Sequence, residues 1–499
     1  MDKTAYLSVY DKTGLAEFAA GLEALGFDVY ASGSTHKFLK QEGIDVEEAR
    51  FSPPLPFAVL KALFSGACVL AENGVEVPPP SLVVCDLYPL ARLTEQEDLG
   101  AEEMSLYLDT ANSAVLRAAA REFETVTVLC DSGDYSPVLE ILKQNGEPAP
   151  ERKKELAAKA YAYCAYYDGT LARYLSGKTD FLRAETVLSL KKVKDLSYGE
   201  NRHQKAAFYA LSGARPSGLN SAKILQGGDL NLNHYLDIET AFEMVSYFEE
   251  PACVVAKHAN PCGAAAGLKL SECFAAALEA DRLGAFGGTA AFNREVDAAT
   301  AEALSESFIE TVIATGYCGE ALKILRAKEG LKTVQLPYPL AAPGEMELFS
   351  LSGGLLIEEK DNLSPAADFK IVSKRVPSPG QTRALRLAWR AAVFAKSYAV
   401  ALATDSATVA IGAGQSSTYD AARLAAMKAG QRHPILKAGA IMAAASDAAL
   451  PVKTLEEILS RGVSAVIEPG GVPEDEACIK LCDQKNAVLA LTGIRHLKH

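Results

Sequence analysis

Residues 5–35 read AYLSVYDKTGLAEFAAGLEALGFDVYASGST, in which two short apolar runs, Ala5–Tyr10 and Phe27–Ala31, each lead through a polar turn into a helical stretch. We expect a third strand at Leu82–Leu87 and a fourth at Thr125–Cys130. Strands that alternate with helices indicate a parallel α/β sheet. Ligands of such sheets bind at the carboxyl ends of the strands, so the turns after the strands are the first candidate sites.

The turns after the first two strands are candidate phosphate cradles. Their sequences are Asp11-Lys12-Thr13-Gly14 and Ser32-Gly33-Ser34-Thr35. Both turns lead into a helix, where backbone N–H groups and the helix dipole attract anions, and the Lys12 ammonium adds a point charge. Ordinary turn and N-cap chemistry explains the same residues, so both interpretations stay open at this point.

The bulk composition bounds the class of protein. The 499 residues carry a formal net charge of −13, which disfavours a duplex-binding protein because phosphate contacts need a concentrated positive surface. No stretch has the apolar length of a membrane span, and the N-terminus has no secretory signal pattern. The ten cysteines are scattered without a C-x-x-C pair, which fits a reducing compartment. We therefore expect a cytoplasmic protein that binds small molecules, neither nucleic acid nor membrane.

The chain divides near its first third. A helical, Ala- and Tyr-rich stretch at Glu151–Leu175 is followed by a linker and a new set of strands. A chain of this length is too long for a single core. We expect an N-terminal domain of residues 1–185 and a second α/β region of residues 195–499.

The most informative segment is Lys257-His258-Ala259-Asn260-Pro261-Cys262-Gly263, which follows a buried strand at Cys253–Ala256. An imidazole accepts a proton near neutral pH, and a neighbouring ammonium supplies charge or a proton. Adjacent residues on a strand point to opposite faces, so Lys257 and His258 reach one site only if the backbone turns there. An exposed Lys beside a satisfied His is the alternative interpretation.

The same segment partly matches the zinc deaminases, which use H-x-E and P-C-x-x-C. Here Asn260 occupies the position of the acid/base Glu, and Ala265 occupies the position of the second Cys. A zinc site without a thiolate ligand and without its catalytic carboxylate does not function. The sequence therefore predicts no catalytic zinc.

Ordered motifs along the whole chain carry a resemblance to a known family. They are SVYDKTG, ASGST, DLYPL, LRAAAREF, YGENRHQ, AKHANPCG, AFGGTAAFNREV, SGGLL, SKRVP, IGAGQ, ASDA, EPGG and GIRHLKH. Together they resemble the bifunctional family that formylates aminoimidazole carboxamide ribonucleotide (AICAR) and closes the product to inosine monophosphate (IMP). One such motif alone is weak, whereas this many in the same order are specific.

The resemblance implies a fold and a chemistry. It implies an N-terminal cyclohydrolase domain with a methylglyoxal-synthase-like parallel sheet. It also implies a C-terminal transformylase of two cytidine-deaminase-like α/β subdomains, with a break near residues 360–380 and no catalytic zinc. Members of the family are homodimers with transformylase sites at the subunit interface. Their formyl donor is 10-formyltetrahydrofolate and their acceptor is AICAR.

The resemblance also implies roles for individual residues. His258 matches the proton acceptor of formyl transfer, and Lys257 matches the residue that assists charge and leaving-group protonation. The candidate substrate-binding residues of the transformylase are Tyr198, Arg202, Asn233, Asn260, Gly287, Gln415, Asp447 and Arg495. Arg202 stands four residues beyond Tyr198, and whether it replaces the Arg that the family has at Ser197 stays open. The matching positions of the cyclohydrolase are Lys12, Ser32, Gly33, Ser34, Thr35, Tyr88, Asp109 and Arg121.

Several positions depart from the family pattern. In the transformylase half, Ser197, Tyr398 and Thr418 stand where the family has Arg, Asn and Arg. In the cyclohydrolase half, Leu60–Ser65 stands where the family has Lys-Thr-Leu-His-Pro, and Arg121 replaces a Lys. Guanidinium groups give phosphate recognition a planar fork, and Arg does not readily shuttle protons.

These departures leave three hypotheses. The first is formyl transfer to AICAR with IMP cyclohydrolase activity weak or lost, and the retained Lys257–His258 pair favours it. The second is a non-catalytic nucleotide-binding relative of the family. The third is a formyltransferase with a different acceptor.

Overall fold

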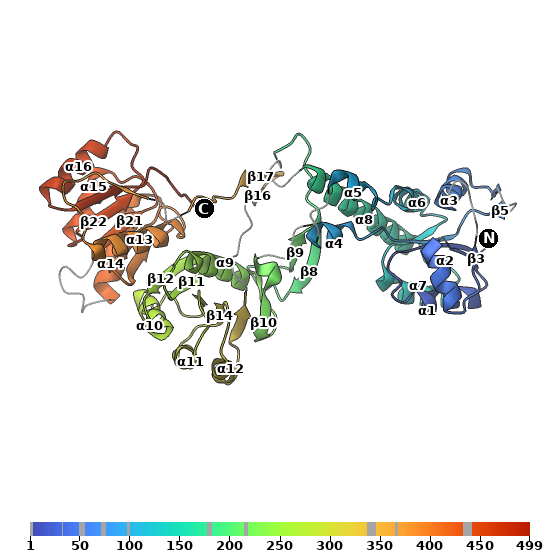
Figure 1. The fold of residues 1–499 in the computed structure, drawn as a ribbon, viewed down its shortest axis with the longest axis horizontal. Helices are drawn as coiled ribbons and strands as arrows, with labels where there is room; N and C mark the ends of the chain where they lie inside the picture. Colours follow the sequence, from blue (N-terminus) through green and yellow to red (C-terminus); the bar gives the residue numbers. More distant parts are fainter. Residues whose placement is uncertain are drawn as a thin grey trace. The chain divides into compact units, whose positions relative to one another are not determined.

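The computed structural model describes residues 3–31, 33–48, 55–70, 76–96, 100–176, 182–213, 218–336, 346–364, 368–432 and 442–499. The chain forms two compact units, each described here by itself (Figure 1). The first comprises Met1–Lys191 with Tyr209–Arg215, and the second comprises Lys192–Phe208 with Pro216–His499. Within the described residues, no helix is both long and apolar enough to cross a membrane.

A five-stranded parallel sheet forms the centre of the N-terminal unit. Its spatial order is β3-β2-β1-β6-β7, and every neighbouring pair is parallel. The strands are β1 (Thr4–Ser8), β2 (Asp28–Ala31), β3 (Glu47–Glu48), β6 (Leu82–Cys85) and β7 (Thr127–Leu129). The parallel α/β prediction is confirmed, and the four predicted strands differ from the observed ones by at most two residues at either end.

Helices cover both faces of this sheet, because its strands bury side chains on both sides. Phe18, Leu39 and Leu142 pack on one face, and Val115 and Ala160 pack on the other. The helices are α1 (Leu15–Ala24), α2 (Gly33–Gln41), α3 (Leu55–Ser65), α4 (Leu90–Gln96), α5 (Ala101–Ser105), α6 (Thr110–Arg121), α7 (Tyr135–Asn145) and α8 (Pro150–Ser176). A small two-stranded sheet joins β4 (Val69–Leu70) to β5 (Glu76–Val77).

The C-terminal unit contains two six-stranded sheets with the same strand order. The first is β10-β15-β14-β13-β11-β12 and the second is β18-β23-β22-β21-β19-β20. In each, three parallel strands stand beside antiparallel strands. The strands are β10 (Lys223–Gln226), β11 (Ala252–Lys257), β12 (Asn260–Ala266), β13 (Thr289–Phe292), β14 (Thr311–Ala314), β15 (Lys332–Gln335), β18 (Lys370–Ile371), β19 (Val400–Ala403), β20 (Thr408–Gly412), β21 (Ala443–Ser446), β22 (Ala465–Glu468) and β23 (Val488–Leu491).

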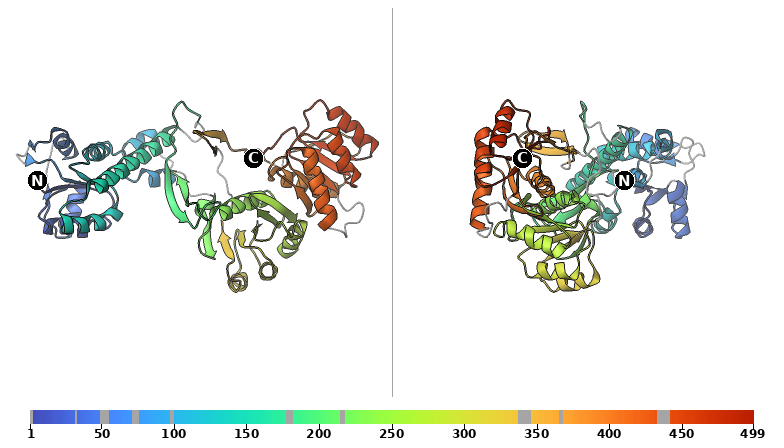
Figure 2. Two further views of the ribbon diagram at one scale, coloured as in Figure 1. Left: turned by 180° about the vertical axis from the view of Figure 1, so that it is seen from behind. Right: turned by 60° about the vertical axis from the view of Figure 1, so that its left-hand side comes forward.

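The two sheets share one hydrophobic core. Helix α9 (Leu232–Ser246) lies along the first sheet (Figure 2), and α13 (Pro379–Val393) packs against the second. Phe242 of α9 and Trp389 of α13 belong to the same buried cluster. The edge strands β12 and β20 also touch, because the Ala264 N–H donates to Thr408 Oγ1 at 2.8 Å.

The remaining elements of the C-terminal unit flank these sheets. The helices are α10 (Leu270–Ala280), α11 (Ala298–Ser305), α12 (Gly319–Arg326), α14 (Thr418–Arg432), α15 (Val452–Ser460) and α16 (Asp475–Gln484). A two-stranded sheet pairs β16 (Met346–Leu351) with β17 (Gly354–Glu359) in this unit. Another pairs β8 (Leu190–Leu196) with β9 (Ala206–Leu211), whose residues are divided between the two units.

Candidate functional site

The predicted catalytic pair lies at a two-residue hairpin turn. Lys257 ends β11 and pairs with Asn260 at the start of β12, which leaves His258 and Ala259 as the loop. The loop residues have φ of 55° and 54°. Positive φ at both positions is what a type I′ turn requires, and Asn-Gly is the sequence that usually supplies it. The chain therefore reverses immediately after Lys257, as the sequence argument required.

Gly287 and Glu310 line the surroundings of Lys257. The Lys257 ammonium donates a hydrogen bond to the carbonyl of Phe286. Gly287 has φ of 72°, and a Cβ there would lie 3.4 Å from Glu310 Oε1 and 3.7 Å from Lys257 Nζ. The absent side chain of Gly287 thus leaves open the space beside an ammonium and a carboxylate.

The N-terminus of α9 brings further polar groups to this region. The Asn231 amide donates to the Tyr198 hydroxyl at 2.6 Å, and the Asn233 amide donates to the Glu200 carbonyl at 3.2 Å. His234 Nδ1 accepts the Asn231 N–H at 3.0 Å, and His234 Nε2 lies 3.9 Å from a Glu310 oxygen. Burial, with a smaller contribution from a nearby lysine, lowers the pKa of His234 to about 4, so this imidazole is neutral at pH 7.

Asn260 links the catalytic turn to the second sheet of the same unit. Its Oδ1 accepts the Lys396 N–H at 2.8 Å. The neighbouring Ser397 hydroxyl donates to Asp447 Oδ2 at 2.6 Å, and the Ala399 N–H donates to Asp447 Oδ1 at 2.9 Å. Burial raises the pKa of Asp447. Two predicted substrate-binding residues, Asn260 and Asp447, are therefore connected through Lys396–Ala399.

The C-terminal tail and Gln415 join the same network. Gln415 and Tyr398 exchange backbone hydrogen bonds of 2.8 and 3.3 Å. The Lys498 N–H donates to the Ser397 hydroxyl at 2.9 Å, so the tail is docked. Arg495 is exposed, and within the described residues its guanidinium makes no hydrogen bond or ion pair. Its charge is free to meet a ligand.

Among the predicted transformylase residues, Arg202 is the second whose guanidinium has no hydrogen bond or ion pair within the described ranges, and it is exposed in the turn after Tyr198. Thr418, which stands where the family has an Arg, is buried at the start of α14. The structure therefore leaves Arg202 and Arg495 as the available planar cations of the predicted set.

Three residues near the catalytic pair were missed by the sequence argument: His234, Asp237 and Glu310. The Asp237 carboxylate accepts the Ala259 N–H at 2.7 Å. The segment Asn231–His234 has the pattern of a helix N-cap, and this local signal could have placed the Asn231 and His234 side chains together at the start of α9. Glu310 directly precedes β14, and nothing in its neighbouring sequence indicates that it faces Lys257.

The N-terminal unit has a second polar cluster at the carboxyl ends of β1, β2 and β6. The Lys12 ammonium donates to the Val9 carbonyl and lies 3.4 Å from Thr35 Oγ1 and 3.5 Å from Ser34 Oγ. Gly33 begins α2 with φ of 43°. Ser32 lies outside the described residues. The two predicted phosphate turns are therefore adjacent at Lys12.

Asp86 organises the first of these turns, and the sequence argument did not single it out. Its carboxylate accepts the N–H groups of Tyr10 and Asp11, the latter at 2.9 Å. Burial raises the pKa of Asp86 and lowers the pKa of Lys12. The Tyr88 ring lies 4.9 Å from the Tyr10 ring, between centroids. Strands β1 and β6 are neighbours at the point where the strand order reverses, which is the usual ligand crevice of a doubly wound sheet.

Asp109 and Arg121 lie at opposite ends of α6. Asp109 caps the helix and accepts the Asn112 N–H at 3.1 Å. Twelve residues of helix separate the two backbones by about 18 Å. The Arg121 guanidinium lies 5.8 Å from the Phe64 ring centroid. The Arg121 side chain therefore lies beside Phe64 at the far end of α6 from Asp109, and its place in the cyclohydrolase-like site stays a prediction.

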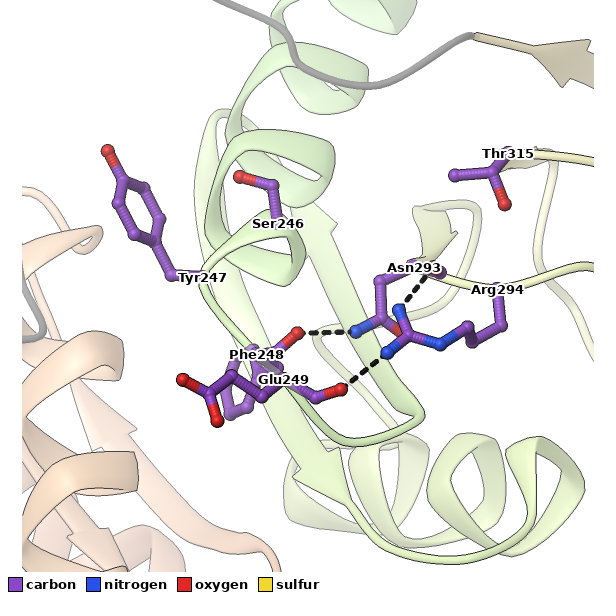
Figure 3. Close-up of a pocket in the computed structure, with 7 residues that line it drawn as sticks. All are labelled: Ser246, Tyr247, Phe248, Glu249, Asn293, Arg294 and Thr315. Carbon is purple, nitrogen blue, oxygen red and sulfur yellow. Dashed lines mark hydrogen bonds between the residues drawn. The ribbon is translucent and has the colours of Figure 1, made fainter.

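A separate cavity of about 540 Å³ lies at the carboxyl ends of β13 and β14, at the far end of β11 from Lys257 (Figure 3). The Asn293 amide donates to the Phe248 carbonyl at 2.8 Å, and the Arg294 guanidinium donates to the carbonyls of Asn293 and Glu249. These donors hold the loop after α9 and do not converge on the cavity. None of the predicted site residues lines it.

Comparisons with known proteins identify the family of the chain. The family model "AICARFT/IMPCHase bienzyme" matches residues 119–428, and the model "MGS-like domain" matches residues 14–98. Relatives called bifunctional purine biosynthesis protein PurH are 38% identical in Bacillus subtilis and in Bacillus mycoides, over 100% of this chain and 99% and 100% of the relatives. The crystal structure of ForH covers 35% of this chain and 97% of its own, at 29% identity and a TM-score of 0.29. The chain belongs to the AICARFT/IMPCHase bienzyme family.

Proposed function

We propose that this chain works in purine biosynthesis by transferring the formyl group of 10-formyltetrahydrofolate to the 5-amine of AICAR. The observation that carries the proposal is the reversal of the chain at His258, which puts an imidazole and the Lys257 ammonium at one end of β11. The amine nitrogen bonds to the formyl carbon, and the bond from that carbon to the folate N10 breaks. His258 takes the amine proton and Lys257 offers a proton to N10.

The experiment is to incubate the purified chain with AICAR and 10-formyltetrahydrofolate and to identify the products by mass. Formyl-AICAR is the expected product. Unchanged AICAR, together with AICAR binding, would favour a nucleotide-binding relative. Folate binding without AICAR binding would favour a different acceptor.

The proposed reaction uses no metal. Asn260 Oδ1, at the position of the deaminase Glu, accepts a backbone N–H. Burial raises the pKa of the Cys262 thiol to about 12, and Ala265 stands at the position of the second deaminase Cys. Zinc ligation needs several such groups together, and the described residues contain no group of three or more His, Cys, Asp or Glu able to hold a metal.

In the N-terminal unit we propose a nucleotide-binding site that keeps its phosphate turns and closes the ring slowly or not at all. Lys12 supplies its positive charge beside Ser34 and Thr35. Lys12→Ala is expected to weaken IMP binding about 10- to 100-fold, because a hydrogen bond to a charged group contributes roughly 1.5–3 kcal/mol. Calorimetric titration of IMP measures the change. The matched control is Lys154→Ala, an exposed lysine on α8; equal affinities in the two variants would refute the assignment.

We further propose that the chain is a homodimer, with the β16–β17 hairpin in the interface. Five apolar side chains of this hairpin are 36–56% exposed: Leu348, Phe349, Leu351, Leu355 and Leu356. Two-stranded sheets are marginal in isolation, and an apolar patch of this kind marks an interaction surface.

Leu356→Asp is expected to convert the dimer to monomer in sedimentation experiments, because it places a charge in the apolar patch. Glu358→Gln on the same strand is the control and should leave the dimer intact. A wild-type chain that sediments as a monomer at all concentrations would contradict the proposal.

A further inference from the structure

Asp237 is a buried carboxylate directed at the backbone of the catalytic turn. It lies on α9 and is 6% exposed. Its Oδ1 accepts the Ala259 N–H at 2.7 Å. A hydrogen bond to an ionised acceptor is about twice as strong as one between neutral groups. The carboxylate is therefore well placed to hold this peptide in a fixed orientation.

The turn needs such a partner because its backbone is strained. His258 and Ala259 both occupy the left-handed region, which costs a residue with a Cβ roughly 1–2 kcal/mol. Neither is the Gly or Asn that usually occupies it. Strained backbone of this kind persists only where its surroundings enforce it, and it gathers at functional sites.

Burial makes the ionised form of the Asp237 carboxylate less favourable. Burial raises the pKa of Asp237 to about 6, although the Ala259 N–H and then the His258 and Lys257 charges lower it. At pH 7 the group is mainly ionised, so an acid that burial disfavours remains charged beside the turn. The ionised carboxylate accepts the Ala259 N–H and so strengthens this hydrogen bond.

We propose that Asp237 is a positioning residue: it holds the Ala259 peptide, keeps the strained turn closed, and so fixes the direction in which His258 approaches the AICAR amine. The inference rests on the proposed formyl transfer. Asp237 acts through the turn and contacts no reacting atom.

Asp237→Ala is expected to lower kcat for formyl transfer about 10- to 100-fold, the loss expected for one charge-assisted hydrogen bond, with the KM for AICAR changed less than about threefold. Asp237→Asn should lose less, because its amide oxygen can still accept the N–H. Thr240→Ala, at another buried polar position on α9, is the matched control and should keep wild-type kcat.

The decisive variant combines Asp237→Ala with Ala259→Gly. Glycine adopts positive φ without strain and is the preferred second residue of a type I′ turn, so the double variant should recover most of the lost kcat. Ala259→Gly alone should remain near wild type. A double variant as slow as Asp237→Ala would overturn the proposal.

Amide hydrogen exchange separates this proposal from the proposed function. The peptide that contains the turn should exchange faster in Asp237→Ala than in the wild type or in Thr240→Ala, whether or not the chain turns over AICAR. Unchanged exchange would refute the positioning role. Absence of formyl transfer in the wild type with faster exchange in the variant would instead refute only the proposed function.

Discussion

Replacing His258 by alanine is expected to slow formyl transfer about 10²- to 10⁴-fold, the usual loss when a general base is removed. The AICAR amine stands beside a carboxamide on an aromatic ring and is a poor nucleophile, so proton removal limits the step. His258 is exposed at the turn and is not tied to another side chain by any hydrogen bond inside the described residues. The measurement is kcat at saturating AICAR and 10-formyltetrahydrofolate.

The binding of AICAR should survive this substitution. The predicted substrate contacts lie on other residues, so the rise in melting temperature on adding AICAR should be close to that of the wild type. Lys323→Ala, at an exposed basic residue on α12, is the control and should retain full turnover. A His258→Ala variant with wild-type kcat would show that another group accepts the proton.

His234 does not replace His258 in this role. Its pKa of about 4 makes it a weak base, and its Nδ1 is already occupied by the Asn231 N–H. Its remaining nitrogen lies 3.9 Å from a Glu310 oxygen. The two histidines therefore have different environments, one exposed at a turn and one half-buried at a helix end, and the first is the more accessible to a substrate.

The sequence predicted those features that depend on local pattern. The strands of the N-terminal sheet follow from short apolar runs, and the position of Lys257 and His258 follows from a buried strand that ends at polar residues. Asp237 and Glu310 could not be found in this way. Asp237 contacts the catalytic turn because α9 packs against β11, and Glu310 comes near Lys257 only because strand pairing brings it beside Gly287. Neither contact leaves a local signal in the sequence.

The repeated sheet of the C-terminal unit is another feature that leaves no local signal in the sequence. Its two sheets have one strand order, yet no short-period repeat is visible in the sequence. Strand order depends on which segments are apolar and in what succession, and many sequences satisfy the same succession. The turn of β11–β12 has two residues, whereas the equivalent connection of β19–β20 spans Thr404–Ala407, so only the first sheet presents the strained catalytic turn.

The cyclohydrolase role of Arg121 stays a prediction, and the structure adds the surroundings of its side chain. The resemblance places it in the cyclohydrolase site, and its identity as a cation is retained. In the structure it ends α6, far along the helix from Asp109, and lies over Phe64. Phe64 itself belongs to the segment that replaces the family's Lys-Thr-Leu-His-Pro. Arg121 and Phe64, two positions that depart from the family pattern, are therefore neighbours in space.

Formyl-AICAR is expected to accumulate in the reaction, with ring closure to IMP at least about 10²-fold slower than formyl transfer, because one missing acid/base group costs that much. Ring closure joins the carboxamide nitrogen to the formyl carbon and expels water, so protons must move at both atoms. Near the phosphate turns the structure offers the Tyr88 phenol and the Asp86 carboxylate, which already accepts two backbone N–H groups.

The measurement is a time course of both products by mass, with formyl-AICAR added alone as the direct test of closure. Addition of a competent cyclohydrolase should convert the accumulated product, which controls for its integrity. IMP that forms as fast as AICAR is consumed would mean that Tyr88, Asp86 and the phosphate turns suffice for closure without the missing histidine.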